Sequence, residues 1–379
     1  MYSLRAFGTM IADAERVGAY AEAIAAAVRP GDSVVDVGCG VGLFSLLACR
    51  AGARRVYAIE ADDCIQVARQ LAIANGVADK MKFFQGDSSR TELPERVNLI
   101  VSDIRGVLPL FQNVIPTLED AKRRFLAAGG AMIPQRDVLN AALIEAPDFY
   151  SRLTSPWETQ IAGLDLKPPL VQLLNQLQSS SFQREQLITT PQDWGEIDYV
   201  AGARTSVAGE LDFEAARPGT VHGVCLWFET KLFGGIGYTS QPGTRTVHGQ
   251  MILPLLKPVR VEAGTKIHVG LHADLINRDY LWRWETKIAG SSGQPELHLV
   301  QSTFQGASFS TQNLRRQEFD YIPALSEAGE AELWMLGQMR GEATLRSIAQ
   351  GAFEKFPGVF ASWQAAFEKV AELSKRASR

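Results

Sequence analysis

The sequence predicts an α/β fold: a doubly wound, Rossmann-like domain, then an antiparallel β-rich barrel or sandwich, and finally a small helical module. Apolar, strand-like runs alternate with helical patterns from residue 34 to about residue 139, which is typical of parallel βαβ units. Period-two alternation dominates 209–305, and three amphipathic helical patterns follow Pro323, the last of them at 353–373. The domains are expected at residues 1–136, 137–318 and 319–379.

Length and composition are those of an ordinary folded protein with more than one domain. The chain has 379 residues, of which 46% are hydrophobic and 21% charged. A net charge of -4 provides no strong basic field, which argues against nucleic acid as a partner. We find no signal-peptide pattern after Met1 and no apolar run of about 18 residues, so we expect no membrane association.

The cysteines indicate the cellular compartment in which we expect the protein. Their positions show no metal-ligand spacing, so we expect no metal and buried thiols in a reducing cytoplasm. The four residues are Cys39, Cys49, Cys64 and Cys225.

The stretch after the first predicted strand is the strongest local signal. Val34–Val37 reads as a buried strand, and an apolar helical segment begins at Leu43. Between them lie three glycines, Gly38, Gly40 and Gly42, which let the backbone pass close to a ligand. Asp36 stands two residues before the first glycine. The spacing predicts a nucleoside-cofactor site, with a nicotinamide site or a structural glycine turn as alternatives.

A second carboxylate supports the nucleoside site. Glu60 ends the next predicted strand, about 20 residues on, where a carboxylate can accept both ribose hydroxyls. Ala61 follows it and is included in the predicted cofactor site. Gly86, Asp87 and Ser88 follow the third strand and are expected beside the adenine ring. The predicted strands are 34–37, 55–59, 81–85, 97–102 and 131–133, and the predicted helices are 43–51, 63–75 and 117–128.

Residues 4–29 carry one helical pattern that runs into the glycine-loop strand. Asp13 and Arg16 are three residues apart on it and therefore share a face, which on an arbitrary helix would be a surface ion pair. The position of this helix lets that face close over the cofactor instead.

These motifs resemble the protein arginine methyltransferases, a family of class I S-adenosylmethionine methyltransferases. The glycine pattern matches their first motif, and Phe7-Gly8 followed by M-I-A-D-A-E-R-V-G-A-Y matches their N-terminal lid helix. The resemblance implies S-adenosylmethionine as cofactor and S-adenosylhomocysteine as product. It also implies that Arg16 grips the cofactor carboxylate and that Met10 lines the acceptor channel. A fixed guanidinium is the natural bidentate partner of a carboxylate.

The acceptor loop departs from the family pattern. The family has S-E-W-M-G with a second glutamate nine residues after the first, and these carboxylates hold the substrate guanidinium. Here the two positions are Asp103 and Gln112, while Gly106 keeps the family glycine. Arg105 stands where an apolar residue is usual, and places a cation beside the acceptor pocket. Less negative charge would compensate a buried guanidinium, so an anionic acceptor gripped by Arg105 is a second interpretation.

His248 occupies the place of the histidine in the family's T-H-W loop, with Val247 and Gly249 beside it. The resemblance implies that it orients the carboxylates and can accept a proton, as its ordinary pKa of about 6.5 allows. A histidine in a sheet is otherwise more often structural.

We therefore expect a methyltransferase of the arginine methyltransferase type that acts on a nitrogen of a peptide or protein. Two alternatives stay open: N- or O-methylation of a small molecule or another non-arginine acceptor, and a non-catalytic cofactor-binding partner. The resemblance also implies a homodimer, joined by an arm within 150–190. The C-terminal module faintly resembles small winged-helix domains that bind precursor peptides, with a packing appendage or dimer contact as the plainer interpretation.

Overall fold

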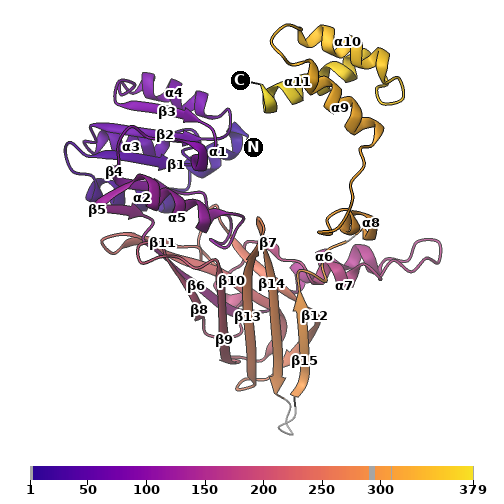
Figure 1. Cartoon of the computed structure of the whole chain (residues 1–379). Coiled ribbons are helices and arrows are strands. Elements are labelled where there is room, and N and C mark those ends of the chain that lie inside the picture. The colour runs from indigo at the N-terminus through magenta and orange to yellow at the C-terminus, as the bar shows by residue number, and fades with distance from the viewer. Residues whose placement is uncertain (1–2, 290–294, 309, 379) are drawn as a thin grey trace. The chain divides into compact units, whose positions relative to one another are not determined.

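The computed structural model describes residues 3–289, 295–308 and 310–378. It divides into two compact units, residues 1–307 and 308–379. The first unit contains both a parallel-sheet part and a β-rich part, and the second is helical (Figure 1). The predicted fold class is confirmed, while the finer domain boundaries stay predictions.

The parallel-sheet part is a five-stranded sheet in the order β3-β2-β1-β4-β5, with all neighbours parallel. The doubly wound order places the carboxyl ends of β1 and β4 side by side, where ligands bind in such sheets. The strands are β1 (Ser33–Val37), β2 (Arg55–Glu60), β3 (Met81–Gln85), β4 (Val97–Ser102) and β5 (Leu126–Ile133). The helices are α3 (Leu43–Arg50), α4 (Ile65–Ala74) and α5 (Val114–Phe125), with a 3-10 turn η1 (Ser88–Arg90).

Two helix predictions were wrong in their bounds. The single helix expected at 4–29 is two helices, α1 (Leu4–Ile11) and α2 (Ala14–Ala27). Asp13 caps α2, because its carboxylate accepts the backbone N–H of Arg16 at 3.0 Å. The helix expected at 117–128 ends at Phe125, and β5 begins at once.

The β-rich part consists of two antiparallel sheets. One has the order β7-β12-β10-β6-β8 with β11 paired to β10, and the other has the order β15-β14-β13-β9. Inward residues alternate with polar ones, as in β13, where Ile267, Val269 and Leu271 are buried. The strands are β6 (Arg136–Ile144), β7 (Gln178–Ser180), β8 (Gln192–Asp198), β9 (Ser206–Glu214), β10 (Gly219–Phe233), β11 (Ile236–Thr239), β12 (Gln250–Val261), β13 (Lys266–Ile276), β14 (Asp279–Ala289) and β15 (Pro295–Ser302).

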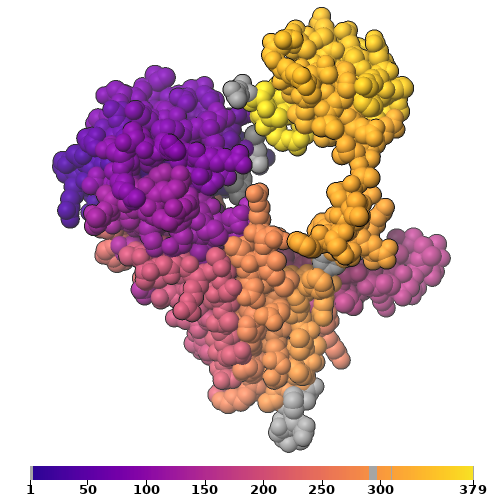
Figure 2. Space-filling model, in the orientation of Figure 1, coloured from indigo at the N-terminus to yellow at the C-terminus, as the bar shows by residue number. Residues whose placement is uncertain are grey.

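One apolar core runs through both parts of this unit, from Val34 in β1 to Ile288 in β14. Figure 2 shows the parallel-sheet part, in indigo to violet, packed directly on the β-rich part, in magenta to orange. Helix α2 contacts both β10 and β11. The carboxyl ends of the parallel strands therefore meet loops of the β-rich part.

The predicted arm at 150–190 covers most of α6 (Pro147–Glu158), α7 (Leu170–Leu174), β7 and a 3-10 turn, η2 (Arg184–Gln186). Among the described residues, no helix is both long and apolar enough to cross a membrane.

The second unit has its own core around Met335, Ile348 and Val370. The helix predicted at 353–373 is interrupted, because α10 ends before Pro357-Gly358 and Ser362 caps α11. Residues 310–378 as described contain helices but no strand, so no wing accompanies them. The helices are α8 (Thr311–Arg315), α9 (Glu327–Gln338), α10 (Leu345–Lys355) and α11 (Trp363–Ala377).

Candidate functional site

A cavity of about 530 Å³ opens where the carboxyl ends of the parallel strands meet α1, α2 and the loop before β12. Its volume lies in the range of small-molecule sites. It brings together eleven of the residues predicted from the sequence: Met10, Arg16, Gly38, Gly40, Glu60, Ala61, Asp87, Ser88, Asp103, Arg105 and His248.

Three predicted residues do not line this cavity. Asp36 is buried behind the glycine loop, where it accepts a hydrogen bond from the Ser45 hydroxyl at 2.6 Å. Burial raises the pKa of Asp36 to about 7, despite that hydrogen bond. Gly42 packs on α4, since a Cβ there would lie 2.8 Å from the Cβ of Ala68.

Gln112, predicted as a catalytic residue, is exposed and has a left-handed backbone with φ of 44°. Its neighbour Phe111 lines the cavity instead. The position that carries the family's second glutamate is thus turned away from the site.

The glycine loop is built for close approach. A Cβ on Gly38 would lie 2.1 Å from Ile104, and one on Gly40 would lie 2.8 Å from Phe7, and both glycines have positive φ. The N–H of Gly40 donates to one Glu60 oxygen at 2.8 Å, and the N–H of Asp62 donates to the other at 2.9 Å. Glu60 is thus fixed at the cavity wall with lone pairs left for a ribose.

Asp87 lies at the far end of the cavity and caps η1, accepting the N–H of Ser89 at 2.8 Å. The hydrogen bonds from Ser89 lower the pKa of Asp87, which keeps it ionised. The Asp87 carboxylate and Ser88 can therefore form hydrogen bonds with the polar edge of a ligand ring in the cavity.

Helix α2 and its N-cap Asp13 contact the loop before β12, the carboxyl end of β4 and helix α1. Asp13 accepts the backbone N–H of Val247 at 2.8 Å, which ties the helix to the loop that carries His248. Tyr20 donates to the carbonyl of Ser102 at 2.9 Å. Between them, Arg16 pairs with Asp103 through Nη1 and donates from Nη2 to the carbonyl of Met10 at 2.6 Å. The pair Asp13–Arg16 is therefore buried at the cavity and is not a surface pair.

Arg16 keeps one buried polar atom without a hydrogen bond, Nε, which lies 3.8 Å from an Asp13 oxygen. A buried donor without a partner costs stability unless a ligand or water satisfies it. The guanidinium of Arg16, a residue that lines the cavity, is thus not fully paired within the chain.

Arg105 does not present a free cation to the cavity. Its side chain is 1% exposed, and Nη1 donates to Asp137 at 2.6 Å and to Thr230 at 2.8 Å. Nη2 donates to Tyr20 at 2.8 Å and to Asp103 and Tyr238 at 3.1 Å. Arg105 thus already has two carboxylate partners, Asp103 and Asp137, which argues against the prediction that it grips an anionic acceptor.

Asp103 lies between two guanidinium groups, with Arg105 on Oδ1 and Arg16 on Oδ2. Burial alone would raise the pKa of Asp103, but Arg105 and Arg16 outweigh it and lower the pKa. Asp103 is thus an ionised carboxylate inside the cavity.

His248 is 9% exposed, and both ring nitrogens have partners. Nδ1 lies 3.0 Å from the carbonyl of Gly106, and Nε2 lies 3.0 Å from the hydroxyl of Tyr238. Burial lowers the pKa of His248.

Sequence reasoning gave no role to Tyr20, Asp137, Thr230 or Tyr238, which surround Arg105. Tyr20 belongs to the lid pattern, and Asp137 is a charge in an apolar strand, which signals a buried partner. Thr230 and Tyr238 carry no such signal, because strand pairing brings them to the site.

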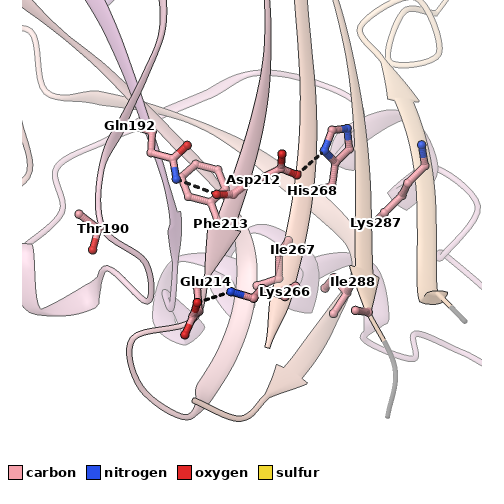
Figure 3. A pocket seen from close by; sticks show the side chains of 11 residues that line it. Thr190, Gln192, Asp212, Phe213, Glu214, Lys266, Ile267, His268, Lys287 and Ile288 are labelled. Atoms are coloured by element: carbon pink, nitrogen blue, oxygen red, sulfur yellow. Dashed lines mark hydrogen bonds and ion pairs between the residues drawn. The ribbon is translucent and has the colours of Figure 1, made fainter. Parts of the chain in front are cut away.

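A larger hollow of about 690 Å³ lies on the β-rich part, across β9, β13 and β14 (Figure 3). It contains no residue predicted from the sequence for the site. Four of its polar side chains pair with each other, Lys266 with Glu214 and His268 with Asp212 (Figure 3), and Lys287 pairs with Glu285 outside the hollow. We therefore place the candidate site in the smaller cavity.

Comparisons with known proteins find methyltransferases. The family model described as ribosomal protein L11 methyltransferase matches residues 6–137. A probable protein arginine N-methyltransferase 6 of Arabidopsis thaliana is 32% identical over 239 residues, covering 59% of this chain and 54% of that protein. Protein arginine N-methyltransferase 1 of Schizosaccharomyces pombe is 29% identical, covering 62% of this chain and 71% of that protein.

The chain is protein arginine methyltransferase-like. That likeness extends to the fold: the Trypanosoma brucei arginine methyltransferase 1 enzyme–prozyme complex with AdoHcy gives a TM-score of 0.72 at 23% identity, covering 78% of this chain and 96% of that one. Arabidopsis thaliana protein arginine methyltransferase 10 gives 0.70 at 22% identity, covering 79% and 98%. The predicted resemblance is confirmed, although the chain spans only about half the length of the Arabidopsis relative in the sequence comparison.

Proposed function

We propose that this protein is an S-adenosylmethionine-dependent methyltransferase of the arginine methyltransferase type, acting on a nitrogen of a peptide or protein. The observation that carries the proposal is the arrangement of Glu60, Arg16 and Asp103 around one cavity. These are a ribose acceptor, a carboxylate binder and an acceptor-facing carboxylate.

The residues fit the cofactor. Glu60 has lone pairs for the ribose hydroxyls, and the lack of a Cβ at Gly38 and Gly40 lets Ile104 and Phe7 pack closely on the glycine loop at the cavity wall. The unsatisfied Nε of Arg16 suits the cofactor carboxylate. When bound, S-adenosylmethionine would supply a sulfonium methyl group, which a nitrogen nucleophile attacks in line with the methyl–sulfur bond.

The protein's part in this reaction is positioning and charge. Arg16 would hold the cofactor carboxylate, and Oδ2 of Asp103, which pairs with Arg16 in this structure, would then accept an N–H of the acceptor. The N–CH₃ bond forms as the S–CH₃ bond breaks, its electron pair stays on sulfur, and S-adenosylhomocysteine is the product. The acceptor nitrogen gives its proton to Asp103 or to water.

The direct test uses S-adenosylmethionine with a labelled methyl group and a cell extract divided into protein, nucleic-acid and small-molecule pools. We expect label in protein, recovered as methylarginine after hydrolysis. Arg16→Ala should abolish it, and Gln112→Ala should leave it unchanged because Gln112 lies outside the cavity. Label only in small molecules would refute the acceptor class, and cofactor binding without any transfer would indicate a non-catalytic partner.

We also propose a homodimer formed through the segment around α6 and α7. Large apolar side chains are exposed there, namely Trp157, Ile161, Leu164 and Val171. Sedimentation should show a dimer that Leu164→Asp converts to a monomer. A monomeric parent chain would refute this.

The described cysteines are all free thiols, which supports a reducing, cytoplasmic location. Fluorescence of a tagged full-length chain tests this, and a signal confined to another compartment would refute it.

A further inference from the structure

The hydrogen bonds of His248 determine which of its nitrogens carries a proton. Nδ1 faces the carbonyl of Gly106 at 3.0 Å, and a carbonyl can only accept. Nδ1 must therefore be protonated, and Nε2 carries either a lone pair or, in the cation, a second proton.

The hydroxyl of Tyr238 decides between these two states. Tyr238 is buried, and its oxygen accepts a hydrogen bond from Arg105 Nη2 at 3.1 Å. Within the part of the chain that the structure describes, its only other hydrogen-bond partner is Nε2 of His248, at 3.0 Å. A buried O–H needs an acceptor, so its hydrogen points to Nε2. A protonated Nε2 would meet that hydrogen head-on.

The surroundings of His248 favour the same state. Burial, with the ring of Phe228 edge-on at 5.1 Å, disfavours the charged form of the ring and is the main reason why the pKa of His248 is lowered. Asp103 attracts a proton to the ring, while Arg105 and Arg16 repel it. Arg105 is itself fixed by Asp137 and Thr230, so it cannot move to release Tyr238.

We propose that Tyr238 is a positioning residue which, oriented by Arg105, holds His248 as the neutral Nδ1–H tautomer. His248 then orients the acceptor loop through Gly106 and does not take the acceptor's proton. The consequence for catalysis rests on the proposed function: since His248 takes no proton, Asp103 is the remaining base that faces the acceptor.

Nitrogen-15 NMR of histidine-labelled full-length protein tests the tautomer without any acceptor. The His248 signals are those missing from His248→Gln. We expect one protonated nitrogen coupled as Nδ1, an unprotonated Nε2, and no titration as the pH falls below about 6.5. A protonated Nε2, or ordinary titration of the wild-type ring, would overturn the proposal.

Tyr238→Phe supplies the second readout. Removing the hydroxyl leaves Nε2 without its hydrogen-bond donor, while Nδ1 still donates to the Gly106 carbonyl. The His248 signals should therefore begin to titrate as the pH falls, while those of His222 stay unchanged. Unchanged His248 signals in this variant would also overturn the proposal. Because these signals need no methyl transfer, failure here leaves the methyl-transfer result standing, and a failed methylation assay leaves the tautomer measurable.

Discussion

The two hollows of the first unit differ in how far their charged side chains are exposed to solvent. In the larger one, the paired side chains are solvent-exposed, with Lys266 at 70% and Glu214 at 58%. In the smaller one, Arg16, Arg105 and Asp103 are at most 8% exposed. Exposed pairs gain little, whereas buried charges cost free energy that must be offset by partners. Buried charge therefore identifies the site better than volume does.

The cavity also contains a carboxylate that is shared by two cations. Asp103 pairs with both Arg16 and Arg105, so under the proposed function Arg16 would exchange Asp103 for a ligand carboxylate without leaving Asp103 unpaired. The larger hollow across β9, β13 and β14, which we call the groove, has no such arrangement among its described residues. Its Lys266 and His268 already pair with neighbouring carboxylates at the surface.

The largest effect that would test this contrast is on stability. Arg105→Met leaves Asp137 and its neighbours as a buried, uncompensated cluster, and we expect a loss of about 3–5 kcal/mol in unfolding free energy. The matched change in the groove, Lys266→Met, should cost less than about 1 kcal/mol. Urea unfolding measures both. Equal losses would contradict the difference between the two regions.

The next effect depends on pH. Asp36 has a pKa raised by burial to about 7, against 3.8 ordinarily. Between these values the folded state holds a proton that the unfolded state has released, so stability falls as pH rises through this window. Each pKa unit is worth about 1.4 kcal/mol, which sets an upper limit of about 4 kcal/mol.

Asp36→Asn keeps an oxygen for the Ser45 hydroxyl and removes the titration. We expect its unfolding free energy to vary less between acid and neutral pH than that of the parent chain. Asp212→Asn in the groove, where the side chain is 91% exposed, should leave the parent's pH dependence in place. Parallel curves for the parent and Asp36→Asn would contradict the buried carboxylate.

Sequence periodicity predicted the fold well because the patterns are local. Buried runs such as Val34–Val37 mark β1, β2 and β4, and alternation marks β13 and β14. The errors lie at boundaries. Leu126 and the alanines after it suit a helix, but pairing of this segment with β4 makes it a strand. Asp13 breaks the first helix because its side chain competes for a backbone N–H.

The site was predictable where the chain brings residues together locally. The glycines and Glu60 belong to one βαβ unit, and the structure joins them by a hydrogen bond at Gly40. The surroundings of Arg105 were not predictable, because Asp137 and Tyr238 reach it through strand pairing in the β-rich part. The position of Gln112 was not predictable either, because its backbone is left-handed at a residue that is not glycine, so the sequence gives no sign of the turn that exposes it.

A smaller effect concerns ligand binding. Glu60→Gln replaces one of two acceptor oxygens with a donor, and we expect it to weaken S-adenosylhomocysteine binding about 10- to 100-fold. His268→Gln in the groove should leave that affinity unchanged. Titration calorimetry measures both variants. An unchanged affinity in Glu60→Gln, or a loss in His268→Gln, would place the cofactor elsewhere.

The smallest effect is the coupling within the exposed pair itself. A double-mutant cycle with Lys266→Met and Glu214→Gln should give about 0.2–1 kcal/mol, and the value should shrink at high salt because exposed charges are screened. The same cycle on the buried pair, with Arg16→Met and Asp103→Asn, should give a larger coupling that salt changes little. If the groove pair couples as strongly as the cavity pair, then exposure does not separate the two hollows, and burial of charge loses its value for locating this site.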